Sequence, residues 1–210
     1  MTEALEQYIL QHSDPESSLL SAMVRDANVN LLRPRMLSGH IQASFIKMMC
    51  RMANASKILE IGTFAGYTAL AMAETLDEKG KIDTIEIDDE MEPFINRYVA
   101  QSLHGDKIHL HIGDAVNIIP QLTEVYDLVF IDADKRLYKT YYDLVFDKVR
   151  KGGVILADNT LWDGKVLNSP TPSDRQTAGI IEFNDYVAAD TRVEKTMIPL
   201  RDGITIIWKK

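Results

Sequence analysis

The sequence predicts an α/β fold: a doubly wound sheet of seven mostly parallel strands, with an antiparallel hairpin at one edge and added N-terminal helices. Three observations support this prediction. Five short β-rich runs alternate with segments that suit helices, two more β-rich runs close the chain, and residues 1–53 read as helical. With 210 residues the chain is expected to form one domain, in which 1–53 packs on an α/β core of 57–210.

The N-terminal segment is expected to contain at least two helices. Asp14–Glu16 is typical of a helix start, because a capping residue precedes a proline in the first turn. Arg33–Arg35 contains a proline that should end this helix, and Ser38 is expected to cap the next one. From Ile41 onward apolar residues recur at helical spacing, which predicts a helix with one buried face.

The rest of the chain alternates between the two kinds of element. Strands are expected at 57–61, 81–86, 107–112, 127–131, 153–157, 192–199 and 203–208. Helices are expected between them at 66–76, 89–103, 114–120 and 135–149. Because strands that are separated by helices run mostly parallel, the first five should form the parallel part of the sheet. Residues 200–202 are too few for a parallel crossover, so the last two strands should form a hairpin.

The composition narrows the class of protein. Lys and Arg number 23 against 31 Asp and Glu, a net charge of −8, which argues against general affinity for nucleic-acid phosphates or anionic lipid. The single cysteine, Cys50, excludes an internal disulfide and a Cys-rich zinc site. The first residues carry no signal-peptide pattern and no apolar run reaches about 18 residues. A soluble, cytoplasmic protein without a membrane partner is therefore expected.

The first predicted strand runs into a turn with two glycines, Gly62 and Gly66. Glycines let the backbone turn tightly and approach a ligand, and the helix that follows offers free N–H groups. The Gly-x-x-x-Gly spacing departs from the Gly-x-Gly-x-x-Gly of dinucleotide sites. Glu60, two positions before the first glycine, would repel a pyrophosphate and attract an ammonium group.

Two more acidic residues follow the next two strands. Glu86 lies 24 residues after Gly62, at the strand end where an acidic residue hydrogen-bonds ribose hydroxyls in nucleoside-binding sheets. Asp114 has two possible roles, as a helix cap or as an acceptor for an adenine amino group, and both roles use its carboxylate as the acceptor. Together these strand ends indicate a nucleoside with a positively charged, non-phosphate appendage. S-adenosylmethionine fits that description better than NAD does.

The fourth and fifth strands end in a cluster of oxygen ligands. Asp132 and Asp158 are 26 residues apart, about one strand–helix–strand unit, so both should emerge at one edge on adjacent strands. With Asn159 they offer the hard, all-oxygen set that suits Mg²⁺, or another divalent cation such as Mn²⁺ or Ca²⁺, and suits zinc poorly. Lys135 would lie one turn away, where the cation's charge favours the neutral amine that acts as a base. Helix caps and turns are the competing interpretation of these Asp residues.

These segments together resemble the small Mg²⁺-dependent O-methyltransferases of the caffeoyl-CoA and catechol O-methyltransferase family. The resemblance extends from about residue 30 to the C-terminus and is most specific at 60–68, 129–135, 152–162 and 202–205. It implies a Rossmann-like class I enzyme that uses S-adenosylmethionine and a divalent metal. The implied reaction methylates one hydroxyl of a small hydroxylated aromatic of the catechol type.

The resemblance also implies a role for individual residues. The implied cofactor-binding residues are Met36, Glu60, Gly62, Tyr67, Thr68, Glu86, Asp114, Ala115, Asp132 and Asp134. The implied metal ligands are Asp132, Asp158 and Asn159, and Lys135 is the implied catalytic base. His40 and Trp162 are expected to line the mouth of the substrate site.

Two alternative functions stay open at this point. An enzyme of the same fold could methylate a hydroxyuridine in tRNA, held by a basic patch of Arg33, Arg35, Lys47 and Arg51, with binding that weakens steeply with salt. A non-catalytic nucleotide-binding module is the other alternative, and Glu60 and the oxygen cluster argue against it. Relatives of this type are commonly homodimers, and the Met-rich helix before the sheet offers an interface, so a homodimer is expected.

Overall fold

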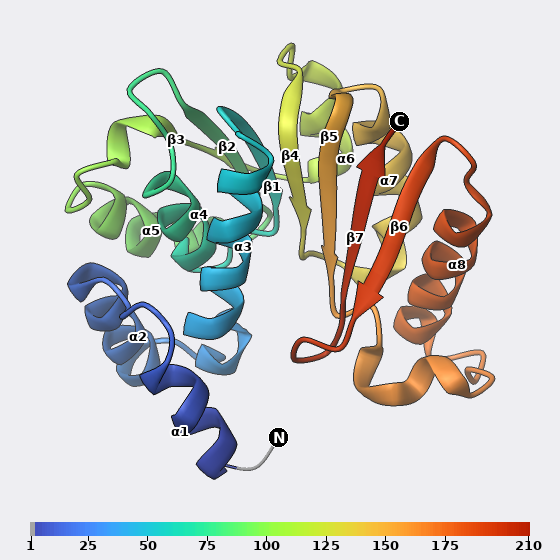
Figure 1. The fold of residues 1–210 in the computed structure, drawn as a ribbon, viewed down its shortest axis with the longest axis horizontal. Helices are drawn as coiled ribbons and strands as arrows, with labels where there is room; N and C mark the ends of the chain where they lie inside the picture. Colours follow the sequence, from blue (N-terminus) through green and yellow to red (C-terminus); the bar gives the residue numbers. More distant parts are fainter. Residues whose placement is uncertain (1–2) are drawn as a thin grey trace.

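A seven-stranded sheet organises the computed structural model, which describes residues 3–210 (Figure 1). The strands are β1 (Lys57–Ile61), β2 (Lys81–Glu86), β3 (Ile108–Ile112), β4 (Tyr126–Ile131), β5 (Val149–Asp158), β6 (Val193–Ile198) and β7 (Ile204–Lys209). Their order is β3-β2-β1-β4-β5-β7-β6. The first five strands are parallel to one another, and β7 is antiparallel to both β5 and β6. The predicted doubly wound sheet with an antiparallel hairpin at its edge is confirmed.

The strand order reverses at β1, which pairs with β2 on one side and with β4 on the other. Ligands of doubly wound sheets bind beyond the carboxyl ends of the strands at such a switch point. Here the main-chain N–H of Asp132, just after β4, donates to the carbonyl of Ile61 at the end of β1 (2.8 Å). The two strand ends are therefore tied together at the edge where a ligand is expected.

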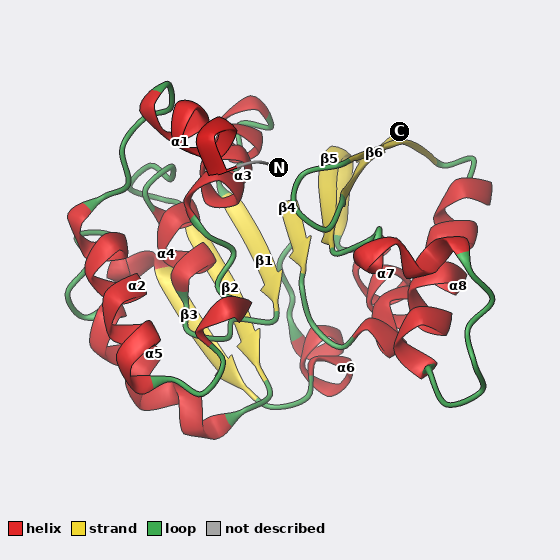
Figure 2. Cartoon of the chain, turned by 90° about the horizontal axis from the view of Figure 1, so that it is seen from below, coloured by secondary structure: helices red, strands yellow, loops and turns green. Residues whose placement is uncertain are grey.

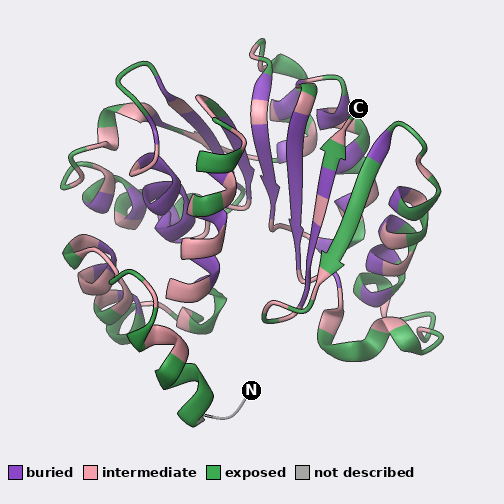
Figure 3. Cartoon of the chain, viewed as in Figure 1, coloured by how far each residue is buried: buried purple, intermediate pink, exposed green. Residues whose placement is uncertain are grey.

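Helices cover both faces of the sheet (Figure 2). One face carries α2 (Ser18–Asn30), α3 (His40–Met52), α4 (Tyr67–Ala73) and α5 (Glu92–Val99); the other carries α6 (Ala115–Ile118), α7 (Tyr138–Phe146) and α8 (Arg175–Ala189). Side chains alternate between these two cores along each strand, as Ile58 and Leu59 do in β1. The central strands are buried almost throughout, whereas β6 is largely exposed at the edge (Figure 3).

The prediction for the start of the second N-terminal helix is wrong. After α1 (Glu3–Gln11), the residues Asp14–Glu16 form a linker and not a helix start. Helix α2 begins three residues later than expected, because Ser17 adopts an extended conformation and its Oγ accepts a hydrogen bond from the Leu20 N–H (3.5 Å). Residues 1 and 2 of the segment predicted to be helical lie outside the described residues.

The predicted role of Ser38 as a helix cap is also wrong. Gly39, with a φ of 76°, occupies the N-cap position of α3, and no side chain caps this helix. The hydroxyl of Ser38 is instead hydrogen-bonded to the hydroxyl of Thr68 in α4 (2.8 Å), and both side chains are buried. The break predicted at Arg33–Arg35 is confirmed, since α2 ends at Asn30 and a single turn, η1 (Pro34–Met36), follows.

Most other boundaries fall within a few residues of those expected, with two exceptions. β5 begins four residues early, because a left-handed Gly152 (φ 74°) followed by Gly153 lets the strand continue across an irregular register with β4. The sequence did not predict helix α8.

Short turns supplement the regular elements: η2 (Asp89–Met91), η3 (Gly105–Lys107), η4 (Ile119–Gln121), η5 (Lys135–Leu137) and η6 (Trp162–Leu167). In the described part of the chain, no helix has the length and apolar character needed to cross a membrane.

Candidate active site

A glycine brings the ends of β1 and β4 into contact. Gly62 follows β1 with a φ of 96°, a conformation that L side chains rarely adopt. A Cβ atom added there would overlap the main-chain carbonyl of Asp132. Only glycine therefore allows the turn after β1 to lie against the turn after β4, so both turns contribute to one site.

A small pocket lies at this junction. Nine residues line it, and five of them are predicted cofactor-binding residues: Met36, Gly62, Tyr67, Thr68 and Asp132. Thr68 is held by its contact with Ser38, which also lines the pocket. The start of α3, the turn after β1 and the turn after β4 thus meet where the sequence predicts the cofactor.

Glu86, at the end of β2, is fixed by main-chain donors. Its two carboxylate oxygens accept hydrogen bonds from the N–H groups of Phe64 (2.6 Å) and Asp88 (3.0 Å). Burial raises the pKa of this carboxyl above its ordinary value, although both N–H groups oppose the shift. Each carboxylate oxygen has more than one acceptor site, so the oxygens can still accept bonds from two ribose hydroxyls.

Glu60, at the end of β1, is a fully buried carboxyl with one satisfied oxygen. Its Oε2 accepts a hydrogen bond from the Thr84 hydroxyl (2.5 Å), whereas Oε1 has no partner within the described residues. Burial raises the pKa of Glu60 to about 8, and the negative charge of Asp132 adds to the shift. A cationic group next to this carboxylate would remove the penalty of its burial.

Two of the predicted cofactor residues are engaged elsewhere. Asp114 caps α6 by accepting a hydrogen bond from the Val116 N–H (2.9 Å), and Ala115 is the first residue of that helix. Asp134 caps η5 and pairs with the Arg136 guanidinium, which lowers the pKa of Asp134. Neither carboxylate is among the nine residues that line the small pocket. Their predicted contacts with the cofactor stay predictions.

Lys135 lies at the centre of the β4–β5 side of the site. Its ammonium donates to Asp132 Oδ1 (2.8 Å) and to Tyr138 Oη (2.6 Å), and the side chain is almost completely buried. Burial raises the pKa of the Tyr138 phenol, which keeps the hydroxyl protonated. That hydroxyl in turn lies within donating distance of the main-chain carbonyls of Asp158 (3.0 Å) and Ile131 (3.2 Å). Lys135 is therefore connected to the ends of both strands.

Asp158 is the second carboxylate of this side. It is 3% exposed, and its oxygens accept hydrogen bonds from the Asn159 N–H (2.8 Å) and from Gln42 Nε2 (2.6 Å). Burial, together with the nearby Asp132 carboxylate, raises the pKa of Asp158 to about 6. Asn159 has a φ of 57°, a left-handed conformation that asparagine tolerates.

The donor set fits a hard divalent cation. No group of three or more His, Cys, Asp or Glu side chains suited to a metal occurs among residues 3–210. The predicted ligands, Asp132, Asp158 and Asn159, are not a group of that kind, because they are two carboxylates and one amide on adjacent strand ends. The Asp132 carboxylate disfavours ionisation of the buried Asp158, a cation would relieve this repulsion, and oxygen ligands suit Mg²⁺.

The turn at Asp158 and Asn159 is anchored by Thr160, the next residue. Its N–H donates to the Gly203 carbonyl (3.1 Å), and its hydroxyl accepts from the Thr205 hydroxyl (2.9 Å). Its carbonyl accepts from Asn184 Nδ2 in α8 (2.8 Å). The β6–β7 hairpin and α8, which lie far along the chain, thus fix the position of Asp158 and Asn159.

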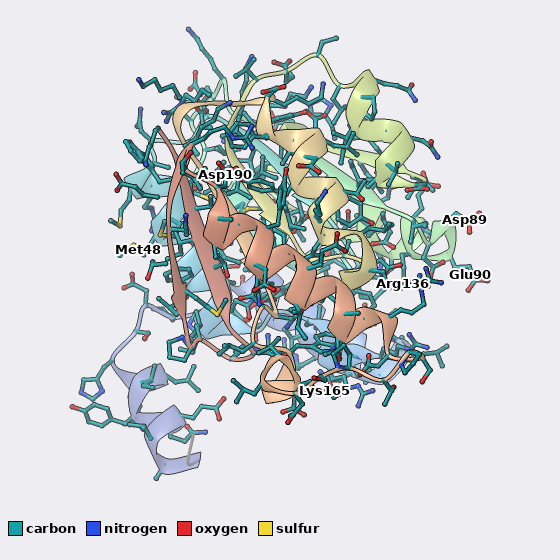
Figure 4. All side chains as sticks on the ribbon, turned by 90° about the vertical axis from the view of Figure 1, so that its right-hand side faces the viewer. Met48, Asp89, Glu90, Arg136, Lys165 and Asp190 are labelled. Carbon is teal, nitrogen blue, oxygen red and sulfur yellow. The ribbon has the colours of Figure 1, made fainter. Side chains whose placement is uncertain are left out.

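Helix α8 also packs on the turn that carries Lys135. A Cβ atom at Gly179 would lie 2.5 Å from the Lys135 carbonyl, so α8 packs directly on η5. In Figure 4 the labelled Arg136 and Lys165 lie near the beginning of α8, at the outer side of this contact. Gly179 gave no signal in the sequence, because its role depends on close packing between two helices.

The two predicted substrate residues occupy different surroundings. His40 Nε2 is hydrogen-bonded to the Asp14 carbonyl (2.8 Å), which ties the beginning of α3 to the linker before α2. Trp162 begins η6 and packs against the core beneath α7 and α8, and its Nε1 is a buried donor without a partner in the described chain. Their contact with substrate stays a prediction.

The chain is similar in sequence to known O-methyltransferases. A sequence model of an O-methyltransferase family matches residues 10–210. A Dictyostelium discoideum protein described as probable caffeoyl-CoA O-methyltransferase 1 is 33% identical over 207 residues, which covers 96% of this chain and 90% of the relative.

Two solved structures are also similar. The O-methyltransferase TomG from Streptomyces achromogenes, in complex with SAM, is 26% identical, with a TM-score of 0.92 and full coverage of both chains. An O-methyltransferase from Bacillus cereus, in complex with SAH, is 27% identical, with a TM-score of 0.91 over 99% of this chain and 97% of the other.

Proposed function

Because this chain belongs to the family of S-adenosylmethionine-dependent O-methyltransferases, we propose that it methylates one hydroxyl of a catechol-type small molecule with the help of a divalent cation. The observation that carries the proposal is the arrangement of Asp132, Lys135 and Asp158. Two carboxylates and one ammonium group lie at adjacent strand ends, beside the pocket expected for the cofactor. The caffeoyl-CoA name of the relative supports a hydroxylated aromatic acceptor.

The cofactor would be held on the β1–β2 side of the site. Gly62 and Thr68 line the pocket, Glu60 offers its unpartnered oxygen to the ammonium of the methionine part, and Glu86 is oriented for the ribose hydroxyls. Asp132, Asp158 and Asn159 would hold the divalent cation on the β4–β5 side. When bound, S-adenosylmethionine supplies the electrophilic methyl group and the cation lowers the pKa of the substrate hydroxyl.

Lys135 has the position of a general base. Its contacts with Asp132 Oδ1 and Tyr138 Oη fix Nζ. A cation bound beside it would favour the neutral amine, which would accept the hydroxyl proton and become the ammonium that donates to these two oxygens. The buried Tyr138 phenol keeps its own proton and orients Nζ. The strand ends hold the reacting groups in place, so the chemistry needs positioning and charge, with no covalent bond to the protein.

The proposal is tested by methyl transfer from S-adenosylmethionine to a panel of vicinal diphenols, with Mg²⁺ and again with excess EDTA. We expect methylated product with Mg²⁺ and none with EDTA. Product that survives EDTA would contradict the role given to Asp132, Asp158 and Asn159. A protein that binds S-adenosylhomocysteine but methylates no diphenol would contradict the substrate class and favour a hydroxylated nucleoside in tRNA.

We also propose that the protein is a homodimer. Apolar side chains are exposed on α1 and α3: Leu5 (50%), Tyr8 (59%), Met48 (54%) and Met52 (81%). Met48 lies at the margin of the molecule in Figure 4. Exposed apolar surface of this kind is typical of a contact between proteins. Light scattering coupled to gel filtration should give twice the monomer mass of 23.7 kDa, and a single monomer peak would contradict the proposal.

A further inference from the structure

We propose that Gln42 is a positioning residue of the cation site: it orients the Asp158 carboxylate and presents its own amide oxygen to the ligands bound there. This inference rests on the proposed function, because it assumes that Asp158 binds a divalent cation. It adds a residue from the N-terminal helices to a site whose other members follow β4 and β5.

The contact between these two side chains is short and buried. Gln42 Nε2 donates to Asp158 Oδ2 at 2.6 Å, and Gln42 is only 1% exposed. A carboxylate oxygen only accepts hydrogen bonds, so the amide nitrogen is the atom that faces Asp158. The amide oxygen is bonded to the same carbon atom and therefore lies beside this contact.

That amide oxygen is a buried acceptor without a partner in the described chain. Burying a polar atom without a hydrogen bond destabilises a protein, so such atoms are rare and usually accept a bond from a water or a ligand. The other buried core residues of α3 are apolar, as Ala43, Ile46 and Cys50 show. Packing of α3 on the sheet therefore does not require an amide at position 42. A ligand that binds beside Asp158 and offers a hydrogen-bond donor would use the amide oxygen of Gln42.

Gln42 is held in place from both sides of the site. The start of α3 is anchored by the Arg201 guanidinium, which donates to the carbonyls of Leu37 (3.0 Å) and Ser38. The hydroxyl of Ser38 is in turn bonded to Thr68 of α4. The β6–β7 hairpin and the cofactor-side helix thus fix the beginning of the helix that presents Gln42, so the amide is rigidly placed.

The neutral charge of Gln42 matters for this role. Asp132 is already paired with the ammonium of Lys135, whereas among residues 3–210 Asp158 accepts only from two uncharged donors, the Gln42 amide and the Asn159 N–H. A neutral donor orients Asp158 and leaves its negative charge available to a cation. A basic side chain at position 42 would compete with that cation, and an acidic one would repel Asp158 until a cation is bound.

The test compares Gln42→Met with a control, Gln121→Met. Methionine preserves the length of the side chain and removes the amide, and Gln121 is an exposed residue whose amide donates only to the Asn117 carbonyl. Mn²⁺ binding is measured by electron paramagnetic resonance in the presence of S-adenosylhomocysteine, whose own affinity is measured by calorimetry. Loss of an outer partner of a metal ligand typically weakens binding by about 10–100-fold.

We expect Gln42→Met to bind Mn²⁺ about tenfold more weakly than the wild type, with unchanged affinity for S-adenosylhomocysteine, and Gln121→Met to bind Mn²⁺ normally. Equal Mn²⁺ affinity in Gln42→Met and the wild type would overturn the inference. A wild type that binds no Mn²⁺ would instead overturn the metal part of the proposed function, so the two failures are distinguishable.

A second variant, Gln42→Glu, keeps the inference testable if Gln42→Met does not fold. Its carboxylate repels Asp158 in the absence of a cation and attracts the cation when one is present. We expect Gln42→Glu to have a lower melting temperature than the wild type in EDTA and a larger gain in melting temperature on addition of Mg²⁺. A gain no larger than that of the wild type would contradict a position beside the cation.

Discussion

The two halves of the site treat their carboxylates differently. On the β1–β2 side, Glu60 and Glu86 accept hydrogen bonds only from a threonine hydroxyl and from main-chain N–H groups. On the β4–β5 side, Asp132 is paired with the Lys135 ammonium. The carboxyl groups of the first half have no charged partner among the described residues, and a cationic ligand would favour their ionised form. The second half also holds Asp158, which has uncharged donors, but it adds a carboxylate that is already paired with a group able to exchange a proton. The difference separates cofactor binding from chemistry.

One contact joins the two halves. The turn at Gly62 lies against the main chain of Asp132, and the Asp132 N–H donates to Ile61. This main-chain contact fixes the distance between the halves, and apart from the charge of Asp132, which contributes to the raised pKa of Glu60, the halves are joined through the main chain. We therefore expect side-chain changes in one half to leave the function of the other largely intact, and changes at the junction to affect both.

The largest effect is expected from Asp158→Ala. Loss of this ligand should remove the cation's contribution of several kcal/mol to the transition state, which corresponds to a fall in turnover of about 10³-fold or more. Affinity for S-adenosylhomocysteine, measured by calorimetry, should change less than about threefold. Asp185→Ala, at an exposed position of α8, is the control. Wild-type turnover in Asp158→Ala would contradict the metal assignment.

The next effect is expected from Lys135→Met. Removal of a general base typically lowers the rate by about 10²–10⁴-fold, and we expect about 10²-fold in kcat because the divalent cation still activates the hydroxyl. Mn²⁺ and S-adenosylhomocysteine should still bind. Tyr138→Phe, which removes only the hydroxyl that orients Nζ, should have a smaller effect on kcat. If Lys135→Met retained full kcat, the base would have to be another group.

A change at the junction, Gly62→Ala, should disturb both halves. The added Cβ would overlap the Asp132 carbonyl at a φ of 96°, and we expect a loss of about 3 kcal/mol in the free energy of unfolding. S-adenosylhomocysteine binding should weaken together with Mn²⁺ binding. Gly164→Ala, where no atom lies near the added Cβ, is the matched control with positive φ. Undisturbed stability of Gly62→Ala in urea titrations would show that the two turns are not in close contact.

The most gradual effect, spread over several pH units, concerns the charge of Glu60. Its pKa in the folded protein, about 8, lies above the ordinary value of 4.5, so the folded state binds more protons than the unfolded state between these values. Stability of the cofactor-free protein should therefore fall as the pH rises from about 5 to 8, with a slope of the order of 1 kcal/mol per pH unit. Glu60→Gln should remove this slope above about pH 6, where Asp158 no longer contributes to it, and the exposed Glu78→Gln should retain it. Parallel pH profiles for wild type and Glu60→Gln would contradict an uncompensated buried charge.

The fold could be predicted largely because the strands are short β-rich runs separated by segments that suit helices. β1 and β2 match the predicted bounds, since each apolar run ends at a polar residue or a glycine turn. Signals that depend on local chemistry were less reliable. Both Ser38 and Ser17 suit an N-cap, but Ser38 is engaged by Thr68 in another helix, and this contact is not visible in the local sequence.

The site could be predicted only where strand topology determines it. Asp132, Lys135 and Asp158 meet because adjacent parallel strands end at one edge. Tyr138 has a local signal in the sequence, because it follows Lys135 by three residues, which is about one helical turn. The contact between Gln42 and Asp158 had no local signal, because it joins residues 116 positions apart and depends on how α3 packs on the sheet.

The most direct test of the separation between the two halves is the affinity for S-adenosylhomocysteine, measured by calorimetry on the wild-type protein with Mg²⁺ and with excess EDTA. If cofactor binding belongs to the β1–β2 half, the dissociation constant should agree within about threefold under both conditions, although EDTA abolishes turnover. Loss of S-adenosylhomocysteine binding in EDTA would contradict this account, because it would show that the carboxylates after β4 and β5 must be occupied before the cofactor can bind.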